Sequence, residues 1–230
     1  VVKPTPVPEQ GGVYTEALVG AMQRLNPLLD ANNPADRDLD RLLFSRLLRY
    51  DDRGIPQPEL AKGWGVSADG TVYNFTLYEN TKWHDGVPLT TEDLIFTVEL
   101  LRNGGTIIAK DLQAFWKEVE IEALNETTIA FRLPEAFSPF TDYLSFGVLP
   151  KHRFEGQTIE QIANSRLNLQ PVGSGPYKFD KLIIEGGEIK GVQLSAFPEF
   201  YGKKPFIEQM IMRYYPDSAT AWQVYQDGKV

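Results

Sequence analysis

Few residues of this sequence have the types and spacing of a reaction centre. Ser174 lies between Gly173 and Gly175, a pattern that can expose a serine nucleophile on a sharp turn. The nucleophile elbow of α/β hydrolases requires glycines two positions before and after the serine, where this chain has Val172 and Pro176. The segment also lacks the third glycine of a dinucleotide-binding loop. We therefore predict that these glycines serve the backbone conformation and bind no phosphate.

The other groups that could perform chemistry are isolated in the sequence. His84 adjoins an Asp-Gly turn and is expected to be a polar turn residue, while His152 lies in a basic, exposed stretch, so a triad or metal site would need long-range partners. Neighbouring carboxylates such as Glu118 and Glu120 are expected on solvated strand faces. The chain has no cysteine, which excludes disulfides and thiolate chemistry. The sequence predicts no catalytic residue, no metal ligand and no cofactor site.

The composition indicates an acidic globular protein. Its 230 residues are 42% hydrophobic and 12% aromatic, which is enough for a packed core in one large domain or two small ones. The formal net charge of −8 argues against a nucleic-acid partner, because phosphate binding needs concentrated Lys and Arg. No segment approaches the roughly 20 apolar residues that cross a bilayer. Residues 1–12, rich in proline and glycine, are expected to form an extended tether.

Hydrophobic periodicity predicts the elements of the first fifty residues. Residues 13–19 are expected to form a strand. Asn33 and Pro34 then introduce a helix whose apolar stripe continues to Tyr50. The other face of this helix carries Asp36, Asp40, Arg41 and Arg49.

The middle of the chain has the alternation of an antiparallel sheet. Residues 72–78 predict one strand, and 119–123 with 129–133 predict a hairpin. A helix is predicted over 90–102, because the hydroxyl of Thr90 can cap it together with a carboxylate three residues later.

The last sixty residues return to strands. A strand beginning at Tyr177 turns at Gly186-Gly187 and returns over 189–194, a further strand covers 210–214, and Asp217 or Ser218 can cap a final helix. Strands and helices alternate without an internal repeat, so the fold class is a mixed α/β (α+β) architecture.

Five segments combine aromatic, proline and glycine residues in a distinctive order. They are Leu25-Asn26-Pro27, Pro58-Glu-Leu-Ala-Lys-Gly-Trp64, Trp83-His-Asp-Gly-Val-Pro-Leu-Thr90, Val172-Gly-Ser-Gly-Pro-Tyr-Lys-Phe179 and Phe200-Tyr-Gly-Lys-Lys-Pro205. In this order they resemble the solute-binding proteins of ABC transporters of the peptide and nickel class, called bacterial extracellular solute-binding protein family 5.

The resemblance implies a periplasmic-binding-protein-like fold of type II. Residues 13–50 and 170–230 would form the discontinuous base of lobe one, and residues 51–169 an inserted antiparallel subdomain. The second lobe would lie outside this chain. A protein of this kind gathers its ligand between two lobes, which close on it.

The implied function is that of an extracytoplasmic solute-binding component of an ABC importer, which binds oligopeptides in an inter-lobe cleft and delivers them to the permease. The family holds its ligand mainly by main-chain hydrogen bonds. That contact maps here to Ala31, Asn32 and Asn33. Phe115 and Trp116 are the aromatic candidates for the cleft rim.

Other readings of the same sequence stay open. The same fold could bind a nickel chelate, an oligosaccharide or an opine, and a protein of another class could be a peptide hydrolase. We expect no enzymatic activity, a monomer, and a peptide or other small solute and an ABC permease as partners. The resemblance implies a location at the extracellular face of the cytoplasmic membrane or in the periplasm, with contact to the membrane only through a lipid anchor upstream of this chain.

Overall fold

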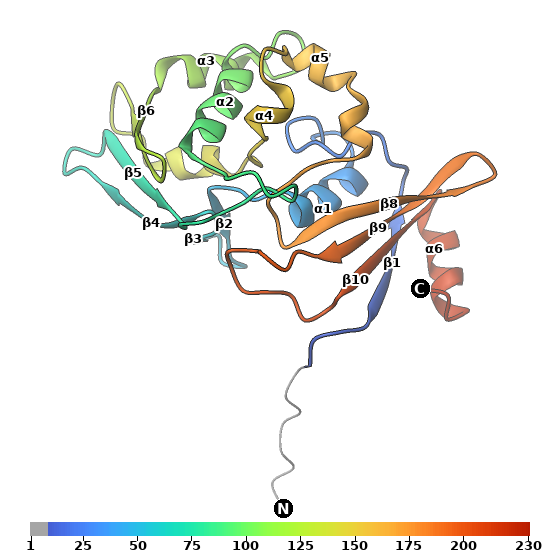
Figure 1. Cartoon of the computed structure of the whole chain (residues 1–230). Helices are drawn as coiled ribbons and strands as arrows, with labels where there is room; N and C mark the ends of the chain where they lie inside the picture. Colours follow the sequence, from blue (N-terminus) through green and yellow to red (C-terminus); the bar gives the residue numbers. More distant parts are fainter. Residues whose placement is uncertain (1–8) are drawn as a thin grey trace, which may run out of the picture.

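The computed structural model describes residues 9–230, which form two four-stranded sheets, one two-stranded sheet and the helices packed on them (Figure 1). The first eight residues of the predicted tether lie outside the described residues. Further along, the N–H of Gly11 donates to the carbonyl of Phe206 at 2.8 Å. Among the described residues, no helix has the length and apolarity that a membrane span needs.

The first sheet brings together strands from both halves of the sequence. Its strand order is β1-β10-β9-β8, with β1 parallel to β10 and the other pairs antiparallel. The strands are β1 (Val13–Val19), β8 (Tyr177–Glu185), β9 (Glu188–Ala196) and β10 (Gln209–Tyr215). The strands expected from alternation in these regions are confirmed.

The second sheet is entirely antiparallel, with strand order β4-β5-β7-β6. Its strands are β4 (Ala61–Val66), β5 (Val72–Leu77), β6 (Glu120–Asn125) and β7 (Thr128–Arg132). The predicted strand and hairpin are confirmed. Tyr73, Phe75 and Leu77 alternate into the core, because successive side chains of a strand point to opposite faces.

The helix after Asn33 is shorter than its apolar stripe predicts. It is α1 (Pro34–Leu43), and the chain leaves it at Phe44 in an extended conformation. Arg46 then forms a β-bridge with Gly147, and β2 (Leu48–Tyr50) pairs with β3 (Pro56–Pro58). The prediction of a helix to residue 50 was wrong, because these long-range pairings outweigh local periodicity.

Helices α2 to α5 gather in the upper part of Figure 1, where α2 and α3 lie next to the second sheet and α5 lies at the opposite side, and α6 lies beside β1. The helices and 3₁₀ segments after α1 are α2 (Thr91–Arg102), α3 (Lys110–Glu118), η1 (Ser138–Leu144), α4 (Lys151–Phe154), α5 (Ile159–Ala163), η2 (Arg166–Leu169) and α6 (Ser218–Gln226). The predicted capping box of Thr90 and Asp93 is confirmed, as is the cap of α6 by Asp217. Within residues 9–230, one buried hydrophobic cluster joins both large sheets.

Candidate functional site

An open cleft of about 570 Å³ lies beside α1, and we call it the α1 cleft. Residues 37, 40, 41 and 44 of its lining are spaced by three or four positions, which places them on one face of a helical turn. The lining residues are Pro27, Asp30, Arg37, Asp40, Arg41, Phe44, Arg46, Tyr50, Ser145 and Gly147. The cleft therefore combines charged groups from α1 with the segment that pairs with Arg46.

The three arginines of the α1 cleft differ in how their donors are used. Arg41 lies 3.6 Å from Asp38, and both side chains are more than half exposed. Arg46 Nε lies 3.3 Å from a carboxylate oxygen of Glu59. Among the described residues, Arg37 makes neither an ion pair nor a side-chain hydrogen bond. Unused guanidinium donors thus face the cleft.

The two carboxyl groups of the cleft have raised pKa values. Asp40 is 2% exposed, and neither of its carboxylate oxygens has a hydrogen-bond partner among residues 9–230. Burial raises the pKa of Asp40 well above its usual value, and the charges of Asp30 and Asp36 add to the effect. The nearby backbone N–H of Asn26, which does not meet hydrogen-bond geometry, opposes the shift. Burial also raises the pKa of Asp30 to about 6, against the opposing charges of Arg37 and Arg41. Protonation of Asp40 is therefore favoured, because an isolated buried carboxylate is costly.

Asp36 is also buried, but its carboxylate is satisfied. It accepts hydrogen bonds from the backbone N–H groups of Gln23 and Arg24 at 3.0 and 2.8 Å, and from Asn33 Nδ2 at 2.7 Å. These bonds fix the loop before α1 against the start of the helix. Asp36 and Asp40, which the sequence places away from the apolar stripe of the helix, are both buried, because α1 packs this side against the loop and the cleft wall.

The turn expected to contact ligand has two different parts. Asn33 is buried, and its side chain donates to the carbonyl of Ala21 at 2.9 Å as well as to Asp36. Ala31 and Asn32 are exposed, and within the described part of the chain their main-chain groups make no hydrogen bond. This short stretch, which follows Asp30 of the cleft, has free backbone donors and acceptors.

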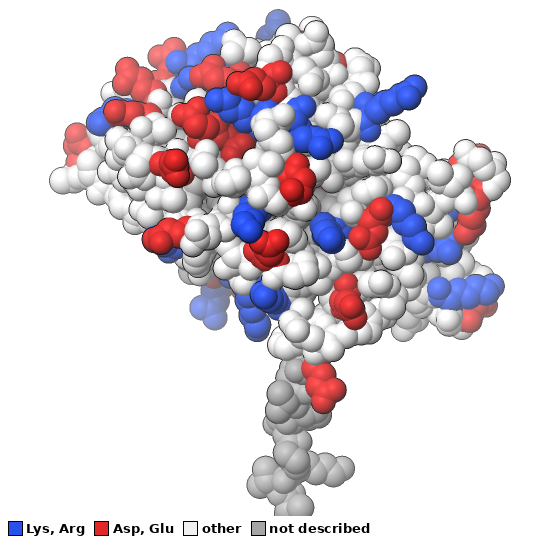
Figure 2. All heavy atoms as spheres, in the orientation of Figure 1, with Lys and Arg blue, Asp and Glu red and all other residues white. Residues whose placement is uncertain are grey.

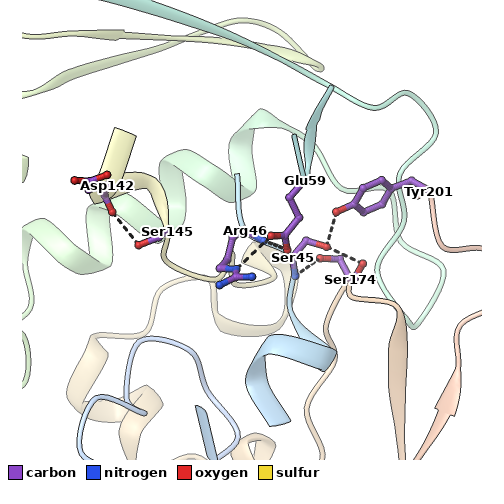
Figure 3. Close-up of polar contacts among 7 residues, drawn as sticks. All are labelled: Ser45, Arg46, Glu59, Asp142, Ser145, Ser174 and Tyr201. Atoms are coloured by element: carbon purple, nitrogen blue, oxygen red, sulfur yellow. Dashed lines mark hydrogen bonds and ion pairs between the residues drawn. The ribbon is translucent and has the colours of Figure 1, made fainter. Parts of the chain in front are cut away.

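A polar junction connects the end of α1 to two distant segments (Figure 3). Ser45 Oγ donates to the carbonyl of Ser174 at 2.9 Å, and the Tyr201 hydroxyl donates to Ser45 Oγ at 2.9 Å. The backbone N–H of Ser45 donates to Ser174 Oγ at 3.3 Å. Both serines are buried, and no histidine contacts Ser174 Oγ in the described residues. The junction therefore has a structural arrangement and lacks the base that a serine nucleophile needs.

Arg46, which lines the α1 cleft, is paired with Glu59 beside this junction. The backbone N–H of Arg46 donates to Glu59 Oε1 at 2.9 Å, which supplements the ion pair. Burial raises the pKa of Glu59, although the Arg46 charge opposes the shift. In Figure 3 the Arg46 guanidinium lies between Glu59 and Ser145. Its ion pair uses Nε, which leaves the two terminal nitrogens free of protein partners among the described residues.

His84 and the Gly-Ser-Gly segment hold each other by backbone contacts. His84 Nδ1 accepts from the N–H of Gly173 at 3.1 Å, and Nε2 lies 3.1 Å from the carbonyl of Gly175. Burial lowers the pKa of His84 to about 4. A Cβ atom on Gly173 would lie 1.8 Å from the Leu43 carbonyl oxygen, and one on Gly175 would lie 2.3 Å from that of Leu42. The predicted backbone role of these glycines is confirmed. His84 lies in the turn as expected, but it is half-buried and its ring also holds the Gly-Ser-Gly segment.

The two aromatic candidates for the cleft rim lie in or against the core. Trp116 is fully buried and packs on Phe140 and Phe146. Phe115 is partly buried and stacks on Tyr143 with 3.9 Å between ring centroids. The structure thus places Trp116 behind the segment that lines the α1 cleft, away from its open side, because a large aromatic ring gains most from full burial.

Other chemistry-bearing residues do not converge. His152 Nε2 lies 2.8 Å from Asp85 Oδ2 at the surface. Among residues 9–230, no three His, Asp or Glu side chains are placed to hold a metal ion. Acidic side chains gather over α2 and α3 at the upper left of the face shown in Figure 2, and no broad basic patch is visible on that face.

The sequence reasoning missed Arg37, Asp40, Arg41 and Arg46 as a group. The available signal was the spacing of positions 37, 40 and 41, which a helix brings onto one face. What no spacing could reveal was that the cleft wall opposite them comes from Ser145 and Gly147, about a hundred residues later.

Comparison with known proteins gives consistent results. The model of bacterial extracellular solute-binding proteins, family 5 (middle region), matches residues 56–230. An ABC transporter peptide-binding protein of Brucella ovis is 33% identical over 192 residues, which cover 81% of this chain and 35% of the relative. The oligopeptide-binding protein AppA of Bacillus subtilis is 24% identical over 231 residues, 97% of this chain and 40% of the relative. The chain thus spans well under half the length of these curated relatives.

Solved structures share the fold. NikZ from Campylobacter jejuni in complex with Ni(L-His) is 30% identical, has a TM-score of 0.79, and is matched over 95% of this chain and 42% of its own. The substrate-binding protein CtaP from Listeria monocytogenes is 30% identical with a TM-score of 0.81, over 96% and 44% of the two chains. AppA in complex with a nonapeptide has a TM-score of 0.83 at 24% identity, over 97% and 44%.

Proposed function

This chain belongs to the bacterial extracellular solute-binding proteins of family 5, and on that premise we propose that it serves as part of the solute-binding component of an ABC importer for oligopeptides. Relatives named as peptide-binding proteins support this proposal. The ligand lies against the α1 cleft and the turn that precedes α1, and the protein delivers it to a permease.

The observation that carries the proposal is the free main chain at Ala31 and Asn32. Their N–H and C=O groups have no partner in the described residues, and both side chains are exposed. An extended peptide can pair with such groups whatever its side chains are, which suits a transporter of varied peptides. Asn33 holds the turn in place through its bonds to Ala21 and Asp36. Phe115 and Trp116 support the cleft wall from behind.

We propose the same division of the chain that the resemblance implies. Residues 13–50 and 170–230 form the base of the lobe, since β1 pairs with β10 in the first sheet. Residues 51–169 form the inserted subdomain, which includes the second sheet. Ser45 and Ser174 fasten the two parts of the base beside the subdomain.

The cellular setting is part of the proposal. We propose an extracytoplasmic location, which the description of the family as extracellular supports. A lipid anchor upstream of this chain and a monomeric state are proposed with it. We assign no catalytic step to the chain, because no base contacts Ser174 within residues 9–230 and the two histidines are engaged with Gly173 and Asp85.

A second candidate ligand is a metal chelate. NikZ, at 30% identity, was solved with Ni(L-His), so the same scaffold holds a small chelate in at least one relative. A chelate would contact fewer main-chain groups than an extended peptide does.

Native mass spectrometry of full-length protein purified from its own host tests the proposal. A peptide mixture that stays bound is expected, because main-chain pairing does not select one sequence. A single non-peptide mass would favour the chelate or another solute instead. Hydrolysis of a peptide library by the purified protein would contradict the assignment of a binding role.

A further inference from the structure

We propose that the α1 cleft is a subsite for a carboxylate group of the ligand, held by the guanidinium groups of Arg37, Arg41 and Arg46. This inference rests on the proposed function and adds the chemistry that the cleft selects. The carboxylate can belong to the carboxyl terminus of a peptide or to an acidic side chain, since both present the same planar anion.

The balance of charge around the cleft is the first argument. Three arginines and two aspartates line it. Asp40 is buried without a hydrogen-bond partner in the described part of the chain and is driven toward its neutral form. Asp30 is then the remaining anionic group among the lining residues of the cleft, and although Asp38 and Glu59 behind the lining pair with Arg41 and Arg46, Arg37 adds a positive charge without such a partner in residues 9–230. Such a local excess attracts an anionic ligand group.

The second argument is that the arginine donors are not consumed by the protein. Arg37 has no side-chain partner in residues 9–230, and Arg46 uses Nε for Glu59 but not its terminal nitrogens. Arg41 lies 3.6 Å from Asp38 in an exposed pair, which is weak and easily exchanged. Guanidinium groups with free terminal nitrogens are suited to bidentate contact with a carboxylate.

The third argument is the position of the cleft. It holds about 570 Å³, enough for one or two ligand residues. Asp30 belongs to its lining, and the free main-chain groups of Ala31 and Asn32 follow directly. A peptide paired with this turn therefore has an anionic group within reach of the arginines without leaving the backbone contact.

Calorimetric titration of full-length protein with matched tripeptides tests the inference. The first set compares a free carboxyl terminus with its amide, and the second compares a glutamate with a glutamine side chain in amidated peptides. The set in which replacing the carboxylate by an amide lowers the affinity shows whether the cleft binds the carboxyl terminus or an acidic side chain. We expect a loss of about tenfold, the usual scale for one charge-assisted hydrogen bond.

Two substitutions test whether the cleft binds an anionic or a cationic group of the ligand. Arg37→Gln should weaken binding of the carboxylate peptide about tenfold, whereas Asp30→Asn should strengthen it, because the competing anion is removed. Arg166→Gln makes the same charge change in η2, outside the cleft lining, and should leave binding unchanged. Arg37 has no protein partner in the described residues, so its variant should keep the thermal unfolding midpoint.

The outcomes separate the inference from the proposed function. Tripeptides that bind equally with and without a carboxylate overturn the carboxylate subsite and leave peptide binding intact. Reversed effects of Arg37→Gln and Asp30→Asn overturn it in favour of a cationic ligand group. If no peptide binds to the folded protein, the proposed function fails and the subsite fails with it.

Discussion

His84 Nδ1 accepts a hydrogen bond from the backbone N–H of Gly173 at 3.1 Å, across 89 residues of sequence. The opposite ring nitrogen lies 3.1 Å from the Gly175 carbonyl, so the neutral ring donates at one end and accepts at the other. Protonation would replace the acceptor with a second donor facing an N–H group. The contact therefore requires a neutral imidazole.

The first prediction concerns pH. Burial lowers the pKa of His84 from 6.5 to about 4, so the unfolded state takes up a proton at higher pH than the folded state. The stabilising contribution is full above pH 6.5 and is lost as the pH falls to about 4, with a total of roughly 3 kcal/mol. Urea denaturation of wild type and His84→Gln between pH 4.5 and 7.5 measures the difference. If the free energy of unfolding depends on pH equally in both proteins, the contact does not require a neutral His84.

The second prediction concerns close packing at Gly173. A Cβ atom there would meet the Leu43 carbonyl oxygen at 1.8 Å, so backbone must move to admit it. Gly173→Ala should lower the free energy of unfolding by about 3 kcal/mol, at the upper end of overpacking effects. Gly63→Ala is the matched control, because nothing lies within 4 Å of a Cβ atom at that position. Similar denaturation midpoints for the two variants would rule out the close contact.

The third prediction concerns the buried carboxyl of Asp40. Its pKa is raised by burial, so the folded state keeps the proton to a higher pH than the unfolded state does. Stability should therefore fall as the pH rises above about 4, and a permanently neutral side chain should remove that loss. We expect Asp40→Asn to raise the free energy of unfolding at pH 8 by about 1–3 kcal/mol. Asp38→Asn, on the exposed side of α1, should change it by less than about 0.5 kcal/mol.

A destabilised Asp40→Asn variant at pH 8 would show that the carboxylate has a partner in solution. Denaturation of wild type alone at pH 5 and pH 8 does not isolate the effect of Asp40. Burial also raises the pKa values of Asp30 and Asp36, so these groups change the free energy of unfolding with pH in the same direction.

The fourth prediction concerns the main chain of the turn that we propose as the ligand contact. Asn32→Pro removes one free N–H, and it should weaken peptide binding about tenfold if that group donates to the ligand. Asn32→Ala keeps the N–H and should bind peptide as wild type does. Fluorescence titration of both variants with one unlabelled peptide measures the ratio. Equal affinity would place the backbone contact elsewhere.

Local signals predicted much of the fold. The capping box of Thr90 and Asp93 is formed by residues three positions apart, and the alternation of β5 reports burial of one face directly. The end of α1 could not be predicted in this way, because it is set by the bridge between Arg46 and Gly147. Sequence motifs identified the His84 region without revealing that its partners lie near residue 173.

The candidate site was less predictable for the same physical reason. Its charged wall is local to α1, but the burial that raises the pKa of Asp40 depends on segments far along the chain. From its aromatic character alone, Trp116 was a candidate for ligand contact at the cleft rim. The packing of Phe140 and Phe146 around its ring shows that it is enclosed.

The parallel pairing of β1 with β10 has a consequence for biogenesis. Val13 aligns with Gln209, so roughly two hundred further residues must be synthesised before β10 is available to pair with β1. The second sheet is complete at Arg132 and can consolidate well before that. We expect pulsed hydrogen exchange to show early protection in β5 and β7 and late protection in β1, which leaves that strand open to chaperones in the interval.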